Sequence, residues 1–292
     1  MTRAIAESIR QGFEELTPSE RKAARVLLTN YPVPGLQTVS QFAKQADVSN
    51  PTILRLVDKL GFGVYSEFQQ RLRDELESRL RSPLTKNSSS GPRDSEDSMG
   101  FLSEFRQSIV EIVNASLQDI VASEFDGAVQ LLTDIRRPVS LIGGRLTSSL
   151  ALQCYLHLRA IRPRVTIIER QTETWAEHLL DVGARDVLIV FDIRRYQDDV
   201  VRYATEASKR GASLILFTDE WVSPIAAVAR HVFAMRTATK SSWDSFTAIS
   251  ALIEAIVSKV TSQRWPDVKH RMEQLEAARE QLAQGQLGVP TP

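Results

Sequence analysis

A group of polar side chains opens a predicted helix that follows a three-residue turn. Residues 38–46 and 50–60 each carry apolar residues at helical spacing, and the turn 47–49 joins them. The small Ala43 and the apolar Val48 suit two helices that cross steeply, as in a helix-turn-helix. In that motif the N-terminal part of the second helix enters the major groove of DNA. The side chains expected to face DNA are Ser49, Asn50, Thr52 and Arg55.

The chemistry of these side chains suits base reading. The Asn50 amide can pair with adenine, and the Arg55 guanidinium can pair with a guanine edge or a phosphate. Lys44 and Lys59 are predicted phosphate contacts. A small helical bundle with a solvated polar face would show the same spacing, so the motif alone leaves both interpretations open.

The elements that hold this motif are predicted to be helical throughout. The run Thr17-Pro18-Ser19-Glu20 is typical of a helix start, with the threonine as N-cap and the glutamate three residues later. Further helical segments are expected at 3–16 and 65–81, without any run of alternating β-branched residues. We therefore predict an all-α helix-turn-helix DNA-binding domain over residues 1–81.

A change of composition predicts a second domain. Residues 82–99 are rich in Ser, Pro, Gly and charge and are expected to form a linker, which leaves residues 100–292 for the second domain. Its run 187–191 is apolar without alternation, as in a strand covered on both faces. Strand-like runs alternate with helical segments, which predicts a doubly wound α/β fold with a parallel sheet. These runs are 138–143, 165–169, 186–191, 212–218 and 231–235.

Two loops after predicted strands could bind an anion, because the carboxyl ends of parallel strands lead into helix N-termini. In the first loop, glycines allow a tight turn, hydroxyls can donate hydrogen bonds, and Arg145 can pair with an anion. A tight turn capped by Thr147 or Ser148 is the alternative. The candidate effector-binding residues of this loop are Gly143, Gly144, Arg145, Thr147 and Ser148.

In the second loop, Arg194 and Arg195 would attract an anion, whereas Asp192 would repel one. Ion pairs of these arginines with carboxylates four residues later, on the surface of a helix, are the alternative. Before the last long helix of the domain, Ser241, Ser242 and Asp244 could touch a ligand, and Ser242 is the further candidate contact. Helix capping is the alternative role for at least one of these side chains.

The N-terminal residues resemble the RpiR family of bacterial transcription regulators. The resemblance rests on the run 16–22 (Leu-Thr-Pro-Ser-Glu-Arg-Lys), the helix-turn-helix, the run 59–62 (Lys-Leu-Gly-Phe) and the run 65–68 (Tyr-Ser-Glu-Phe), in this order and spacing. It implies that the second domain is a SIS (sugar isomerase) domain that senses small phosphorylated metabolites. The resemblance also implies that the protein is a DNA-binding regulator, and membership of this family would favour a repressor.

The second loop departs from the Ser-x-Ser-Gly-x-Thr phosphate loop of that family. Asp192 and Arg194 stand where the two serines would be, Arg195 replaces the glycine, and Gln197 replaces the threonine. We therefore expect an altered cradle and leave the effector class broad. It is a small anionic metabolite, either a sugar phosphate or a related phosphorylated or carboxylated compound.

Composition narrows the function classes. The 292 residues contain 36 Lys and Arg and 36 Asp and Glu, so DNA contact must come from a local surface rather than a global positive field. The single Cys154 excludes internal disulfides and cysteine-based zinc sites, and we expect no metal or cofactor. The sequence has no apolar stretch long enough to cross a membrane, so we expect a cytoplasmic protein without a membrane partner.

An isomerase-type enzyme is one alternative function, because aldose–ketose isomerisation needs a general base. Glu173, Glu177 and His178 lie together on one predicted helix, but a solvated helix face is the favoured explanation of this group. The attached DNA-binding domain and the altered loop lead us to predict that the protein is not an enzyme. A DNA-binding dimer without any ligand is the other alternative.

The expected partners are a double-stranded DNA operator, a small anionic effector and further copies of the chain, as a homodimer or homotetramer. The charged helix predicted at 265–284 packs against its own domain or forms a dimer contact.

Overall fold

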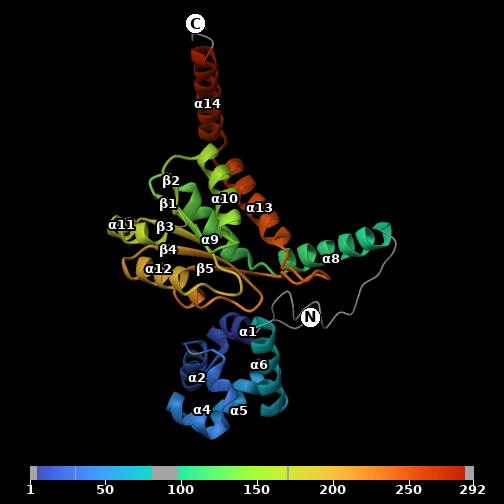
Figure 1. Cartoon of the computed structure of the whole chain (residues 1–292). Helices are drawn as coiled ribbons and strands as arrows, with labels where there is room; N and C mark the ends of the chain where they lie inside the picture. The colour runs from blue at the N-terminus through green and yellow to red at the C-terminus, as the bar shows by residue number, and fades with distance from the viewer. Residues whose placement is uncertain (1–4, 30, 81–97, 170, 287–292) are drawn as a thin grey trace.

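The computed structural model describes residues 5–29, 31–80, 98–169 and 171–286. It contains a helical N-terminal unit and a C-terminal unit built on a parallel sheet (Figure 1). The predicted fold class is therefore confirmed. Most of the predicted linker lies outside the described residues, and its positions 98 and 99 begin α8 (Ser98–Gln118).

Short helices with well-defined starts form the N-terminal unit. The Thr17 N–H donates to Glu20 Oε2 at 2.8 Å, and the Glu20 N–H donates to Thr17 Oγ1 at 3.4 Å, so the predicted capping box is present. Thr38 and Gln41 form a second capping box. The elements are α1 (Ile5–Gln11), η1 (Phe13–Glu15), α2 (Pro18–Thr29), α3 (Val33–Leu36), α4 (Val39–Ala46), α5 (Asn50–Lys59) and α6 (Tyr65–Leu80).

The core of this unit lies where the apolar faces of α2, α4 and α5 meet. Leu27, Phe42 and Ile53 are fully buried there. The short α3 approaches α6 closely, because a Cβ on Gly35 would lie 2.4 Å from Leu72 Cδ1. This packing fixes the orientation of α5, which carries the predicted DNA-reading residues.

The C-terminal unit contains one sheet with the strand order β2-β1-β3-β4-β5, and every neighbouring pair is parallel. Parallel pairing brings the carboxyl ends of all the strands to one edge of the sheet. The strands are β1 (Val139–Gly143), β2 (Val165–Ile167), β3 (Val187–Phe191), β4 (Ser213–Asp219) and β5 (His231–Met235). Each lies within or close to a run that the sequence predicted.

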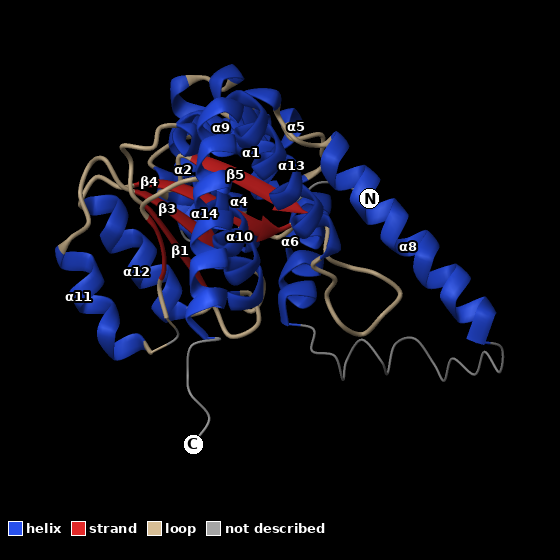
Figure 2. Ribbon diagram, turned by 90° about the horizontal axis from the view of Figure 1, so that it is seen from above, coloured by secondary structure: helices blue, strands red, loops and turns tan. Residues whose placement is uncertain are grey.

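Helices cover both faces of this sheet (Figure 2). Val187, Ile189 and Phe191 pack toward α9 (Ala122–Thr133), α10 (Ser148–Ile161) and α13 (Thr247–Gln263). Leu188 and Val190 pack toward the opposite layer. That layer contains α11 (Trp175–Leu180) and α12 (Asp198–Lys209). The alternation of β3 between two cores confirms the doubly wound arrangement.

Two helices extend away from the sheet. α8 packs with α13 and β5, and α14 (Trp265–Gln286) continues from α13 and projects from the domain (Figure 1). Two short 3-10 helices complete the unit, η2 (Thr172–Thr174) and η3 (Pro224–Ala227). Among the described residues, no helix combines the length and the apolar character that a membrane span requires.

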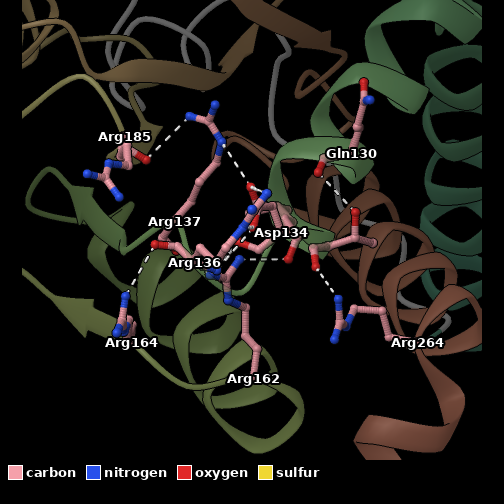
Figure 3. Close-up of polar contacts among 10 residues, drawn as sticks. Gln130, Asp134, Arg136, Arg137, Arg162, Arg164, Arg185 and Arg264 are labelled. Atoms are coloured by element: carbon pink, nitrogen blue, oxygen red, sulfur yellow. Dashed lines mark hydrogen bonds and ion pairs between the residues drawn. The ribbon is translucent and has the colours of Figure 1, made fainter.

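Arginines surround Asp134 at the amino edge of the sheet (Figure 3). Arg162 is fully buried and donates to the carbonyl oxygens of Leu132 at 2.6 Å and Asp134 at 3.3 Å. Arg264 Nη1 donates to the Thr133 oxygen at 3.0 Å. These guanidinium groups satisfy the last carbonyls of α9, where the helix dipole favours positive charge.

Candidate DNA-reading helix and strand-end site

The turn between α4 and α5 has a defined backbone. Asp47 ends α4 in the left-handed region with φ 51°, and the Val48 N–H donates to the Ala43 oxygen at 3.0 Å. Ala43 is buried, as the predicted crossing of the two helices requires. Lys22 Nζ lies 2.5 Å from Asp47 Oδ2 and lowers the pKa of that carboxyl. The predicted helix-turn-helix arrangement is therefore present.

The start of α5 presents polar side chains to solvent. The hydroxyls of Ser49 and Thr52 lie 2.9 Å apart, and Asn50 Nδ2 donates to Ser40 Oγ at 3.0 Å. Arg55 is exposed further along the same helix. The structure thus places the four predicted base-reading side chains at the N-cap and in the first half of one helix, where Ser49, Asn50 and Arg55 are exposed and Thr52 is half-buried.

The two predicted phosphate contacts differ in their surroundings. Lys44 is exposed on α4, whereas Lys59 Nζ donates to Glu20 Oε2 at 2.8 Å and to the Glu15 oxygen at 3.2 Å. Burial of Glu20 would raise its pKa, but hydrogen bonds from Lys59 and Thr17 lower it. Lys59 therefore has a structural partner on α2, and its phosphate contact stays a prediction.

The first strand-end loop is held by its own hydrogen bonds. Thr147 Oγ1 donates to the Phe191 oxygen at 2.6 Å and accepts the Gly144 N–H at 2.7 Å. The Arg145 N–H donates to Gln197 Oε1 from the second loop. A Cβ on Gly143 would lie 2.6 Å from the Thr147 carbonyl, so only glycine fits that position. The Arg145 side chain remains exposed.

The second strand-end loop surrounds a buried carboxyl group. Ser223 Oγ donates to Asp192 Oδ2 at 2.5 Å, and the Gln197 N–H donates to Asp192 Oδ1 at 3.4 Å. Burial raises the pKa of Asp192 to about 7. A serine hydroxyl and a backbone N–H thus bind the two carboxyl oxygens of Asp192, which belongs to the chain itself.

Arg194 makes a buried ion pair across the edge of the sheet. Its Nη2 lies 2.6 Å from Asp244 Oδ1 and its Nε donates to Asp244 Oδ2 at 3.2 Å, and the Arg194 side chain is only 4% exposed. Arg194 precedes α12, which begins at Asp198, so the alternative of a helix-surface pair between these two residues is wrong. Arg195 is exposed, and Ser242 is half-buried in the loop that carries Asp244.

Further carboxyl groups lie at the end of β4. Asp219 accepts the Arg194 N–H at 2.9 Å and the Tyr196 hydroxyl at 2.6 Å, and its burial raises its pKa. Glu220 Oε2 accepts the Thr237 N–H at 3.1 Å. Burial and the charge of Asp219 raise the pKa of Glu220 to about 7. Within the described ranges, no group of three His, Cys, Asp or Glu side chains is placed to hold a metal ion.

Two family models match the chain. The model "Helix-turn-helix domain, rpiR family" matches residues 3–79, and the model "SIS domain" matches residues 131–259. The chain belongs to the RpiR family. It is a DNA-binding transcriptional regulator in which a helix-turn-helix domain precedes a SIS domain, as the sequence resemblance implied.

Known proteins are similar to this chain in sequence or in fold. An uncharacterized HTH-type transcriptional regulator of Haemophilus influenzae is 22% identical over 227 residues, which cover 75% of each chain. The sugar isomerase domain of an RpiR transcription factor from Sphaerobacter thermophilus has a TM-score of 0.56 at 20% identity and covers 60% of this chain and 97% of its own. The Vibrio vulnificus NanR protein, complexed with ManNAc-6P, has a TM-score of 0.54 at 17% identity. The match covers 95% of this chain and 98% of the NanR chain.

The RpiR-family regulator carries strand-end residues that were not among the predicted effector contacts. Gln197, Asp219 and Ser223 bond to the candidate loops, although they belong to three different elements or loops. Their position at or after the ends of buried strands indicates that they lie at the same edge of the sheet. Their bonding partners could not be predicted, because those partners lie far away in the sequence. Asp244 was noted as a possible ligand contact and is instead the ionic partner of Arg194.

The strand-end site also touches the DNA-binding unit of the regulator. The guanidinium carbon of Arg71 on α6 lies 6.0 Å from the centre of the Trp221 ring, in the loop between β4 and η3. The η3 helix lies beside α2. The backbone N–H of Trp221 donates to Asp219 Oδ1 at 3.2 Å. The contact between Arg71 and Trp221 is therefore linked directly to the buried carboxyl group of Asp219.

Proposed function

We propose that this regulator binds a two-fold DNA operator through α5 and acts as a repressor whose DNA affinity changes when a small anionic metabolite binds at the strand ends. Ser49, Asn50, Thr52 and Arg55 read bases, while Lys44 and Lys59 contact phosphates. Five of these six side chains are exposed at the helix-turn-helix, which supports this assignment, whereas Thr52 is half-buried and Lys59 is bound to Glu20. Because it acts on the chromosome, we place the protein in the cytoplasm.

The observation that carries the effector proposal is the buried pair of Arg194 and Asp244. A guanidinium that binds a carboxylate in bidentate geometry can bind a phosphate or carboxylate of a ligand in the same way. The effector anion takes the place of Asp244 on Arg194, and the loop around Ser242 moves with the displaced carboxylate. The structural relative NanR is complexed with ManNAc-6P, a sugar phosphate, which supports this ligand class.

The remaining predicted effector contacts surround this pair. In the proposal, Arg145 and Arg195 add positive charge at the rim, since both are exposed. Gly143, Gly144, Thr147 and Ser148 form the turn beside the ligand and supply backbone groups once Gln197 shifts. The effector is a sugar phosphate or a related phosphorylated or carboxylated compound.

We propose that the protein has no enzymatic activity. Glu173 lies in η2 and is exposed, and on α11 Glu177 is exposed and His178 is half-buried. The bonded partners of Asp192 and Asp219 hold these carboxyls in place, whereas a general base must reach a substrate proton.

The active form in the proposal is a homo-oligomer, so that two copies of α5 meet two half-sites. The α8 helix supports this because its first turns carry exposed apolar side chains that its own domain does not cover. They are Met99, Phe101, Leu102 and Phe105.

A thermal-shift screen of the full chain tests the effector proposal. The panel contains sugar phosphates, amino-sugar phosphates and carboxylates without phosphate. A ligand at 100 times its Kd stabilises the fold by about 2.7 kcal/mol, a readily measured shift. We expect a hit that disappears in Arg194→Met. No shift across the panel would favour the ligand-independent dimer, and turnover of a sugar phosphate would favour the isomerase.

A further inference from the structure

The α14 helix has little support from its own domain. Its 22 residues span about 33 Å. Val268 is buried and Leu275 is half-buried, but every residue from 276 to 283 is exposed. Figure 1 shows the helix projecting from the sheet. An isolated helix end of this kind is marginal in water, so a partner surface would stabilise it.

Side chains along one face of α14 follow the spacing of a coiled-coil seam. Val268, Leu275 and Leu282 recur every seven residues, and Met272 and Arg279 fall between them at the alternating three- and four-residue spacing of a coiled coil. Val268 faces the domain, whereas Leu282 is 73% exposed. The seam therefore continues beyond the part of the helix that packs on the protein itself.

A groove of about 440 Å³ lies beside this seam, between α10 and α14. Leu156, which is 57% exposed, and Leu275 line it together with the arginines 159, 271 and 279. Arg271 is anchored there because it donates to the Arg159 oxygen at 2.9 Å and the Ala160 oxygen at 3.2 Å. The groove is thus apolar at its base and positively charged at its walls.

The end of α14 is complementary to this groove in charge. Residues 273–286 contain Glu273, Glu276 and Glu280 against the single Arg279, and a helix C-terminus adds partial negative charge. The ion pair between Arg279 and Glu276 within one helix is exposed and is easily exchanged for one between chains. The groove and the end of α14 that would fill it lie on the same chain. A two-fold contact between two copies requires this, because each copy must offer both surfaces.

We propose that α14 of a second copy of the chain lies antiparallel in the groove between α10 and α14. In this register Met272 of each copy faces Leu282 of the other, and Arg279 lies beside Glu276 of the other copy. The contact needs neither DNA nor effector. It lies away from the exposed turns of α8, so its loss would leave an α8-mediated dimer intact.

Cysteine cross-linking of the full chain tests this register. The single native Cys154 is buried and its pKa is raised to about 12, so engineered thiols react alone. In the double variant Met272→Cys/Leu282→Cys, ten residues of helix separate the thiols by about 15 Å, which excludes a disulfide within one chain. We expect mild oxidation to give a covalent dimer from this variant.

Single variants and charge substitutions complete the test. Leu282→Cys alone should give no disulfide, because identical positions do not meet in the antiparallel register. Leu282→Glu should lower the assembly mass in sedimentation velocity, whereas Leu180→Glu on α11, at a site that is 82% exposed, should not. A disulfide from the single variant, no disulfide from the double variant, or an unchanged mass for Leu282→Glu would overturn the proposal.

Discussion

The guanidinium carbon of Arg71 lies 6.0 Å from the centre of the Trp221 ring, and this contact joins the DNA-binding unit to the loop that follows β4. Asp219, the last residue of β4, accepts the backbone N–H groups of both Arg194 and Trp221, so a displacement of the Arg194 backbone would reach α6 through Asp219 and Trp221. A cation–π contact contributes about 0.5–1 kcal/mol at an exposed site and about 2 kcal/mol when desolvated. A free energy of this size is enough to shift the equilibrium between two arrangements of the DNA-binding unit and the SIS domain.

Trp221→Ala should therefore reduce the effector-dependent change in operator affinity while leaving effector binding intact. Fluorescence anisotropy with labelled operator, with and without effector, measures the first quantity, and the thermal shift measures the second. Trp265→Ala, at an exposed tryptophan on α14, is the matched control. An unchanged effector response in Trp221→Ala would show that the coupling takes another route.

Arg55→Ala should weaken specific operator binding by about 1–3 kcal/mol if the guanidinium reads a base. Lys59→Ala should act differently, because it removes the partner of the nearly buried Glu20 and lowers the unfolding free energy. Anisotropy at fixed salt and urea denaturation separate the two effects. A specific affinity unchanged by Arg55→Ala would contradict the assignment of α5 as the reading helix.

Asp192 should make stability depend on pH near neutrality. Its pKa is about 7 in the folded protein against an ordinary value of 3.8, so the folded state holds the proton more tightly. The resulting stabilisation is complete below pH 4 and is lost as the pH rises through 7, by up to about 1.4 kcal/mol per pH unit.

The variant Asp192→Asn isolates this effect, because asparagine can keep the hydrogen bond with Ser223 and does not titrate. The difference in unfolding free energy between wild type and variant should shift in favour of the variant between pH 5 and 8. Urea denaturation at several pH values measures it. A difference that stays constant over this range would mean that Asp192 is ionised throughout.

Arg162→Leu should lower the unfolding free energy by about 2–4 kcal/mol, since it leaves buried carbonyls at the end of α9 without their donor. Arg136, which is 83% exposed in the same cluster, provides the control, and Arg136→Ala should change stability little. Equal effects of the two substitutions in thermal unfolding would contradict the role assigned to burial of Arg162.

Local sequence patterns predicted much of this fold. The capping residues at Thr17 and the apolar run at 187–191 were readable because their structural partners are near neighbours or because their pattern is periodic. The short α3 was not predicted, since four residues carry too little periodicity.

The contents of the candidate site were harder to predict. Arg194 and Asp244 are fifty residues apart in the chain, and only the parallel sheet brings their loops to one edge. The buried bond between Asp192 and Ser223 has the same origin. Residue types alone suggested an open anion site, whereas the folded chain fills that site with its own carboxyl groups.

The most direct test of the account is operator affinity of the full chain at fixed salt, measured with and without the ligand that the thermal-shift screen identifies. Wild type should change its operator affinity by tenfold or more, while Arg194→Met should bind operator normally and not respond. An equal response of Arg194→Met and wild type would contradict the claim that an anionic effector binds at Arg194 and controls DNA binding.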